Sequence, residues 1–192
     1  IGDVMEELGS SYNVALGASA GGSGAFYLST QMPIQQLITF SPAFPSSAYT
    51  DPATPRRAFF DFKKLLMEPK AYFEVLFVTL GARFIWRKVS KAVGEENIPD
   101  LARLYAETKP VPPRATIFYG RRCRPDSAQA ESLRHLPTIR LRPVESGRHN
   151  CAADLKKQGI LGKVIMDEIE AGLHEWRAAH AVLEPAFAQA ER

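Results

Sequence analysis

"VALGASAGGSGAFYL", residues 14–28, joins three kinds of sequence in one short stretch. It begins with apolar residues typical of a buried strand, passes through small residues around Ser19, and continues from Ala20 with a pattern typical of a helix. A tight turn between a strand and a helix serves two kinds of enzyme. In one it holds a nucleophilic serine, and in the other it is a glycine-rich loop that binds a phosphate.

The composition of the chain limits the classes of protein to consider. Its 192 residues, 45% hydrophobic and 23% charged, are enough for one globular domain with a core. A net charge of +3, without a run of basic residues interleaved with aromatics, argues against a nucleic-acid partner. The longest apolar stretch, residues 71–85, contains Glu74 and Arg83 and is shorter than the roughly 20 residues of a membrane span, so we expect no span.

The two cysteines, Cys123 and Cys151, are too few for a disulfide framework and lack the spacing of a zinc site. They are expected to be inert thiols, with a pairing of the two left open. We therefore expect no metal.

Four short apolar runs predict strands, at 12–16, 37–40, 115–119 and 138–144. The last run alternates apolar residues with arginine, which indicates a place nearer the sheet edge. An amphipathic tail, 162–179, is expected to pack against the sheet. Strands that alternate with helices predict an α/β fold, with a mostly parallel sheet and helices on both faces.

Residues 44–113 form a connection that is too long for an ordinary crossover. We therefore predict a core made of residues 1–43 and 114–192, and a helical cap or insertion at 44–113. A dimerisation element is the alternative for this segment. The aromatic residues of this segment either line an approach to the site or form the core of the cap itself, and their helical spacing favours the core. They are Phe59, Phe60, Tyr72, Phe73, Phe77 and Trp86.

The residues around Ser19 fit the requirements of a nucleophile. A serine that attacks a carbonyl group must be exposed, lie near a base, and have backbone N–H groups beside it that bind the oxyanion. Gly17 and Gly21 occupy the positions two before and two after Ser19, where a sharp turn leaves no room for a bulky side chain. The pattern is G-x-S-x-G between a strand and a helix, which is the nucleophile elbow.

At these residues the chain resembles the α/β-hydrolase superfamily, over the C-terminal half of that fold only. The family's order along the chain is nucleophile, then acid, then histidine. Asp126 follows the third predicted strand in "GRRCRPDSAQAESL", and His149 follows the fourth in "ESGRHNCAADL", where it is expected to open a helix. The resemblance implies that Ser19, Asp126 and His149 form a catalytic triad, with Glu145 as the reserve acid.

The resemblance also implies a reaction. Ser19 attacks an ester or thioester, His149 takes its proton and returns it to the leaving group, and Asp126 orients the imidazole. The N–H of Ala20 supplies one oxyanion donor, and no metal or organic cofactor is needed. In this family the second donor comes from a loop upstream of the nucleophile strand. We therefore expect the chain to be N-terminally truncated. A helix predicted just before Gly9 is expected to be the last part of a longer element that begins upstream.

A second likeness concerns "TFSPAF", "PDSAQAESL" and "RHNCAADLKKQGIL". These segments look like a group of bacterial hydrolase-like proteins associated with glycan or surface-polysaccharide functions. The likeness implies a bacterial protein that acts on a small-molecule or glycan-linked ester. The sequence indicates neither the oligomeric state nor the compartment.

Two other functions remain open. "GASAGG" and "YAETK" are similar to the cofactor loop and the Tyr-x-x-x-Lys pair, Tyr105 and Lys109, of short-chain dehydrogenases that use NAD(P). That family has a glycine where Ser23 stands, and Pro110 ends the helix that Lys109 needs. The other alternative is a non-catalytic binding protein with the hydrolase fold.

Two further residue sets have alternative interpretations. Asp126 follows a proline and is also suited to cap the helix 127–133. Four arginines on the loops beside the expected site favour an anionic substrate or form a solvated rim; they are Arg121, Arg122, Arg124 and Arg148.

Overall fold

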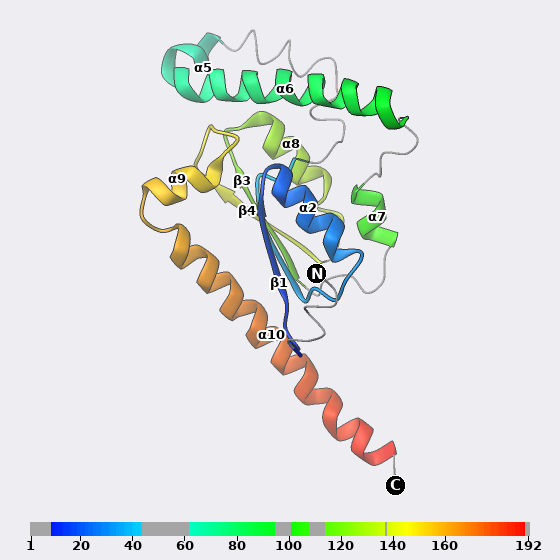
Figure 1. Cartoon of the computed structure of the whole chain (residues 1–192). Coiled ribbons are helices and arrows are strands. Elements are labelled where there is room, and N and C mark those ends of the chain that lie inside the picture. Colours follow the sequence, from blue (N-terminus) through cyan, green and yellow to red (C-terminus); the bar gives the residue numbers. More distant parts are fainter. Residues whose placement is uncertain (1–8, 44–61, 95–100, 108–113, 137, 191–192) are drawn as a thin grey trace.

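The computed structural model describes residues 9–43, 62–94, 101–107, 114–136 and 138–190 (Figure 1). Its four strands form one parallel sheet in the order β1-β2-β3-β4. They are β1 (Val14–Ala18), β2 (Gln36–Phe40), β3 (Arg114–Gly120) and β4 (Ile139–Val144). The predicted parallel sheet of an α/β fold is confirmed.

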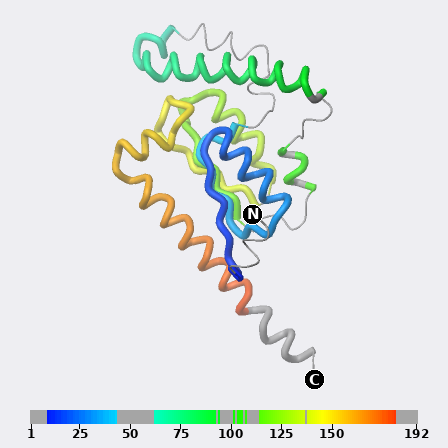
Figure 2. Tube along the Cα trace, in the orientation of Figure 1, coloured from blue at the N-terminus to red at the C-terminus, as the bar shows by residue number. Residues whose placement is uncertain are grey.

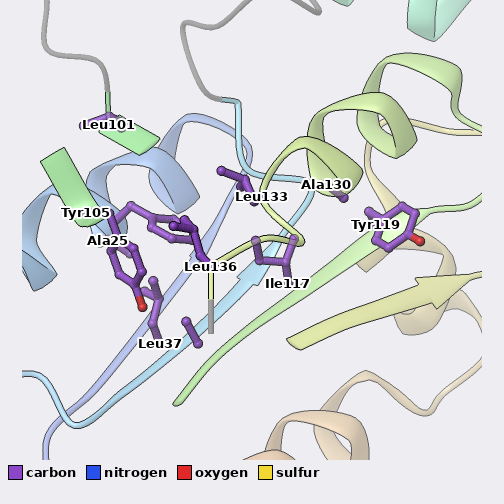
Figure 3. Packing of buried hydrophobic residues seen from close by; sticks show 11 residues of the cluster. Ala25, Leu37, Leu101, Tyr105, Ile117, Tyr119, Ala130, Leu133 and Leu136 are labelled. Atoms are coloured by element: carbon purple, nitrogen blue, oxygen red, sulfur yellow. The ribbon is translucent and has the colours of Figure 1, made fainter. Parts of the chain in front are cut away.

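Helices cover both faces of the sheet (Figures 1 and 2). On one face lie α2 (Ala20–Ser29), α7 (Leu101–Glu107) and α8 (Arg124–Ser132), which bury a cluster of apolar side chains against β2 and β3 (Figure 3). On the other face, α9 (Cys151–Lys157) and α10 (Leu161–Ala190) cover Ile38, Phe40 and Phe118. The amphipathic tail therefore packs on the sheet, as predicted, through residues such as Val164 and Ile169.

β1 is an edge of the described sheet, and the prediction that it is buried was wrong. Leu16 exposes 53% of its surface, and an open groove of about 440 Å³ is lined by residues of β1 and α2. The reason is position rather than composition, because β1 pairs only with β2 in the part of the chain that the structure describes. β4 forms the opposite edge, which the alternation of apolar residues and arginine correctly indicated.

The described helices of the predicted insertion, 44–113, lie in two separate places (Figure 1). α5 (Phe62–Met67) and α6 (Pro69–Val93) lie across the end of the sheet where the strands finish (Figure 1). α7 instead packs beside α2, where the Tyr105 ring meets Phe26 edge-on with centroids 5.2 Å apart. The boundary at residue 113 thus does not separate core from insertion, because α7 contributes Leu101 and Tyr105 to the core.

Some sequence expectations fall on residues outside this description. They are the helix before Gly9, the aromatics Phe59 and Phe60, and Lys109. Within the described ranges, no helix has the combination of length and apolar character needed to cross a membrane.

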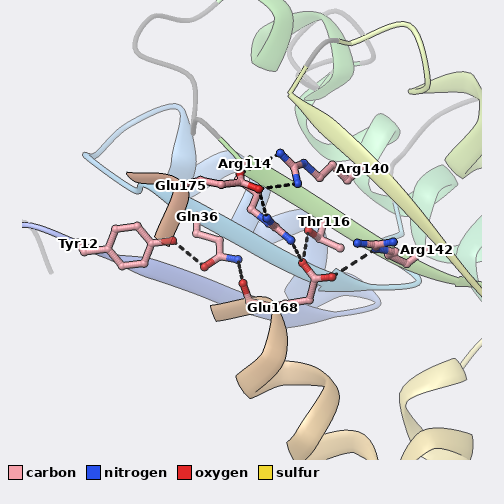
Figure 4. Close-up of polar contacts among 8 residues, drawn as sticks. All are labelled: Tyr12, Gln36, Arg114, Thr116, Arg140, Arg142, Glu168 and Glu175. Carbon is pink, nitrogen blue, oxygen red and sulfur yellow. Dashed lines mark hydrogen bonds and ion pairs between the residues drawn. The ribbon is translucent and has the colours of Figure 1, made fainter. Parts of the chain in front are cut away.

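A buried ion pair fastens α10 to the sheet (Figure 4). Arg114 at the start of β3 donates to Glu168 on α10 across 2.5 Å, and Thr116 donates to the same carboxylate across 3.0 Å. Arg142 of β4 lies 3.3 Å from the other carboxylate oxygen. Burial raises the pKa of Glu168, but the hydrogen bonds and positive charges of these partners outweigh it and hold the pKa below its ordinary value.

The arginines of β4 therefore have a partner that their edge position did not reveal. Arg140 pairs bidentately with Glu175 of α10, across 2.9 and 2.8 Å, and Glu175 also accepts from Arg114. Gln36 donates to the backbone carbonyl of Glu168 across 2.6 Å. The polar side of β4 is thus covered by acidic side chains of α10 rather than by water alone.

Glu168→Gln should lower the free energy of unfolding by about 2–3 kcal/mol, because it removes a charged acceptor from the buried Arg114. The matched control is Asp167→Asn, which breaks an exposed pair with Lys163 and should cost less than about 0.5 kcal/mol. Urea unfolding at neutral pH measures both.

The same pair predicts a pH dependence. A carboxyl group whose folded pKa is lowered contributes stability above its unfolded pKa, and that contribution disappears as the pH falls through the folded pKa. The difference between the wild-type protein and Glu168→Gln should therefore shrink below about pH 4. A difference that grows on acidification would contradict this assignment.

Candidate active site

The three residues predicted as a triad meet at the edge of the sheet where the parallel strands end. Ser19 follows β1, Asp126 lies in the first turn of α8 after β3, and His149 lies in the loop after β4. Ligand sites of open α/β sheets form at this edge, since the loops that follow parallel strands all gather there.

A chain of two hydrogen bonds joins the three side chains. Ser19 Oγ lies 2.8 Å from His149 Nε2, and His149 Nδ1 lies 2.8 Å from Asp126 Oδ1. An ionised carboxylate only accepts, so the Nδ1 proton faces Asp126 and Nε2 is left to accept from the Ser19 hydroxyl. Asp126 and His149 are buried, at 3% and 5% exposure, whereas Ser19 is half-buried and can be reached from solvent. The arrangement can move a proton from Ser19 to His149.

Ser19 occupies a backbone conformation that L-residues rarely adopt, with φ 50° and ψ −122°. Strain of this kind persists only where the surroundings hold it. The Ser19 N–H donates to the Phe40 carbonyl across 2.9 Å, and the Ser19 carbonyl accepts from Ala43 N across 3.0 Å. The Ser23 hydroxyl donates to the Ala43 carbonyl, so the loop after β2 supports the turn.

The glycines of the turn differ in what they permit. A Cβ at Gly17 would lie 2.3 Å from the Gly21 carbonyl oxygen, so Gly17 is required for the close approach of strand and helix. A Cβ at Gly21 would meet nothing within 4 Å among the described residues. A Cβ therefore fits at Gly21, and the expectation that this position cannot carry a bulky side chain stays a prediction. Gly22 is the tighter position, 3.0 Å from Pro42 Cβ.

Ala20 is the first residue of α2 and is exposed next to Ser19. The first N–H groups of a helix have no acceptor within the helix and carry its partial positive charge. The predicted oxyanion donor thus lies at a helix N-terminus beside the candidate nucleophile.

The loop that carries His149 crosses over the end of β3. Arg122 N donates to the Ser146 carbonyl across 2.9 Å, and a Cβ at Gly120 would lie 2.7 Å from the Arg148 carbonyl oxygen. Gly120 therefore permits the crossing.

Glu74 of α6 holds the residues on both sides of His149. Its carboxylate accepts from Arg148 Nε across 2.5 Å and from Asn150 N across 2.9 Å. The only sign of this role in the sequence is that Glu74 is the single acidic residue within the stretch that forms α6. Asn150, rather than His149, caps the next helix, accepting from Ala153 N. Asn150 thus takes the capping position, and His149 is directed at Ser19.

Neither the alternative acid, Glu145, nor the interpretation of Asp126 as a helix cap agrees with the structure. Glu145 is exposed and pairs with Arg121 across 2.8 Å. Asp126 lies inside α8, whose N-cap is Cys123, so Asp126 does not cap the helix. The structure therefore brings Asp126, and not Glu145, to His149.

Three of the four arginines near the site are bound to carboxylates. Arg121 pairs with Glu145, Arg122 with Glu68 and Arg148 with Glu74. An anionic substrate would have to compete with these carboxylates for the arginines. The structure therefore favours the interpretation that the arginines form a solvated rim over the interpretation that they bind an anion.

Both cysteines are free and buried. Burial, with the Asp126 charge adding to it, raises the pKa of Cys123 well above its usual value, and burial raises the pKa of Cys151 to about 11. Thiols with raised pKa values stay protonated at neutral pH and react poorly. Across the described ranges, no group of three or more His, Cys, Asp or Glu residues could hold a metal ion.

Tyr105, the tyrosine of the dehydrogenase alternative, belongs to the apolar core. Its hydroxyl bonds to Thr138 across 2.9 Å, and burial raises its pKa to about 12. A tyrosine that acts as an acid or base near neutral pH needs the opposite shift. This placement disfavours the dehydrogenase interpretation.

No protein-family model and no curated protein matches the chain. Among solved structures, the chain is similar to an α/β hydrolase from Sphaerobacter thermophilus DSM 20745, with a TM-score of 0.46 and 16% identity. The similarity covers 84% of this chain and 70% of that chain. At this level it concerns the overall fold and carries no information about activity.

Gly17→Ala should destabilise the protein by about 3 kcal/mol or more, because the added methyl group collides with backbone. Gly21→Ala is the matched control and should change stability by less than about 1 kcal/mol, toward greater stability, because alanine favours the helix. Thermal and urea unfolding compare the two. Equal losses would show that the turn does not have the close approach described above.

Glu74→Gln should lower the free energy of unfolding by about 1.5–3 kcal/mol. Glutamine keeps the shape and one acceptor oxygen, but its NH₂ group then faces a second donor. Glu145→Gln breaks only an exposed pair and should cost less than about 0.5 kcal/mol. Urea unfolding of both variants tests whether Glu74 anchors the His149 loop, and a Glu74→Gln loss no larger than the control's would refute it.

Proposed function

We propose that this protein is a serine hydrolase of the α/β-hydrolase type that cleaves an ester or thioester through an acyl-serine intermediate. The observation that carries the proposal is the hydrogen-bonded chain from Ser19 through His149 to Asp126, with Ser19 on a strained turn between a strand and a helix. A nucleophile, a base and a group that orients the base are the three parts that this chemistry requires.

In the proposed reaction, Ser19 Oγ attacks the carbonyl carbon while His149 Nε2 takes the hydroxyl proton. The carbonyl oxygen becomes an oxyanion, which the N–H of Ala20 and the N-terminus of α2 stabilise. His149 then gives its proton to the departing alcohol or thiol, which leaves an acyl group on Ser19. Water, deprotonated by His149, then attacks the carbonyl carbon of this acyl group. The bond to Ser19 Oγ breaks, His149 returns the proton to Oγ, and the acid is released.

Asp126 has a supporting role in both halves of the reaction. Its carboxylate fixes the ring of His149 with Nε2 toward Ser19 and stabilises the imidazolium that forms. Because Asp126 and His149 are buried, water weakens this interaction little.

The substrate is proposed to be a neutral small-molecule or glycan-linked ester. Three nearby arginines are paired with carboxylates, and this supports an uncharged substrate over an anionic one. The glycan-linked alternative rests only on the likeness of three sequence segments to bacterial hydrolase-like proteins.

A fluorophosphonate probe tests the proposed nucleophile, because it phosphonylates activated serines. The wild-type chain should be labelled at Ser19, as mapped by mass spectrometry, and Ser19→Ala should not be labelled. His149→Ala should react at least about 100-fold more slowly, since a general base contributes this much or more. His135→Ala, which removes an exposed histidine of the helix-to-strand connection, is the matched control and should react like the wild type.

Other outcomes would favour the other functions. A folded protein that is not labelled at Ser19 would refute the nucleophile. Labelling without turnover of a p-nitrophenyl ester would favour the non-catalytic binding protein. A thermal shift with NAD or NADP, without labelling, would favour the dehydrogenase.

A further inference from the structure

The outer face of α5 and α6 is apolar and open to solvent. Nine of the thirteen exposed large hydrophobic residues in the described ranges lie on these two helices. Leu66, Phe77 and Phe84 expose 83%, 69% and 60% of their surfaces. Tyr72 is buried, but Phe73 and Phe77 are exposed, so the prediction that the aromatics form the cap's own core is wrong for these two, because α6 turns only its other side toward the protein.

Four of the six exposed large apolar residues of α6 form a continuous stripe. Phe73, Phe77, Leu80 and Phe84 follow one another at intervals of three and four residues, which places them on one side of a helix. The rings of Phe73 and Phe77 stack with their centroids 6.4 Å apart. Scattered apolar side chains are ordinary on a protein surface, but a contiguous apolar patch marks an interaction site.

The charges around the stripe are of one sign. The exposed charged residues of the two helices are all basic: Lys63, Lys70, Arg87, Lys88 and Lys91. The two acids on or beside α6, Glu68 and Glu74, are turned inward to Arg122 and Arg148. Lys88 Nζ lies 4.6 Å from the centroid of the Phe84 ring, so cation and aromatic residue share one surface.

We propose that the outer face of α5 and α6 binds the surface of an anionic phospholipid bilayer. A helix with aromatic and aliphatic residues on one face and Lys and Arg beside them lies in the plane of a membrane surface, with its apolar side chains among the acyl chains and its cations at the headgroups. The basic residues of α6 are too many for it to cross a bilayer, in keeping with the lack of a spanning helix among the described residues.

A second copy of the chain fits this face less well. A two-fold antiparallel pairing of α6 centred on Leu80 would set Phe73 of one copy against Arg87 of the other, with no exposed acid on either helix to pair with the cations. Anionic headgroups supply the missing negative charge, and acyl chains supply the apolar partner. Charge complementarity thus selects the bilayer over the dimer.

The same helix faces the candidate active site on its inner side. Glu74 holds the residues that flank His149, whereas the stripe begins one residue earlier, at Phe73. Docking would therefore hold the candidate site close to the membrane plane. The inference rests on the surface alone and does not depend on the proposed hydrolase activity.

Flotation with lipid vesicles tests the inference. The chain should float with vesicles of phosphatidylcholine containing about 30 mol% phosphatidylserine, should bind vesicles of phosphatidylcholine alone at least about tenfold more weakly, and should be partly released by high salt. Two double variants, Phe77→Ser with Phe84→Ser and Lys88→Glu with Lys91→Glu, should each weaken binding by about tenfold or more.

Matched controls separate this surface from general effects. Met166→Ser and Lys157→Glu change an exposed apolar and an exposed basic residue on α10 and α9, and both should bind vesicles like the wild type. All the substituted residues are exposed, so circular dichroism and thermal unfolding should be unchanged.

Three results would overturn the inference. The first is the absence of binding to anionic vesicles. The second is binding that the two double variants do not weaken. The third is a dimer in solution that Phe77→Ser with Phe84→Ser dissociates, which would assign the face to a second copy. Binding to polyglutamate with no binding to vesicles would instead assign it to an acidic protein.

Discussion

The site depends on the close passage of the His149 loop over the end of β3. β1 and β4 are opposite edges of the described sheet, yet the residues that follow them lie within hydrogen-bond distance. The loop covers this span by crossing directly over Gly120, where a Cβ would lie 2.7 Å from a carbonyl oxygen of the loop. A second close passage, of Gly17 against Gly21, brings Ser19 up from the other side. Both passages need a glycine because backbone meets backbone there.

α6 has two distinct sides, one that packs on the protein and one that carries exposed apolar residues. Its inner side packs on the protein and, through Glu74, holds the His149 loop, while its outer side carries the apolar stripe with basic residues. The one acid of the helix is directed inward, and this leaves the outer face with charges of a single sign. The rotation of α6 about its axis thus decides both that Glu74 reaches the His149 loop and that the charges of the outer face are all basic.

Much of the arrangement follows from local pattern. The apolar runs at 12–16, 37–40, 115–119 and 138–144 predicted the four described strands. The resemblance of the sequence to α/β hydrolases implied the order serine, aspartate, histidine, and these side chains meet because parallel strands bring their following loops to one edge. Features that depend on the neighbours of a residue were missed. Leu16 has the composition of a buried strand but lies at an edge, and Phe77 has the spacing of a core residue but faces outward. An apolar side chain does not specify which partner, if any, covers it.

The sequence by itself determined the parallel α/β class and the turn at Ser19, because these depend on periodicity and chain order, which are local or topological. The candidate triad was implied by the resemblance to the α/β-hydrolase superfamily. Only the tertiary structure decided that Gly120 permits the loop to cross, that Glu74 anchors it, and that β4 is fastened through its arginines to acids of α10. These are contacts between residues far apart in the chain. Their partners are set by distance and orientation in the folded protein, and no interval along the sequence encodes them.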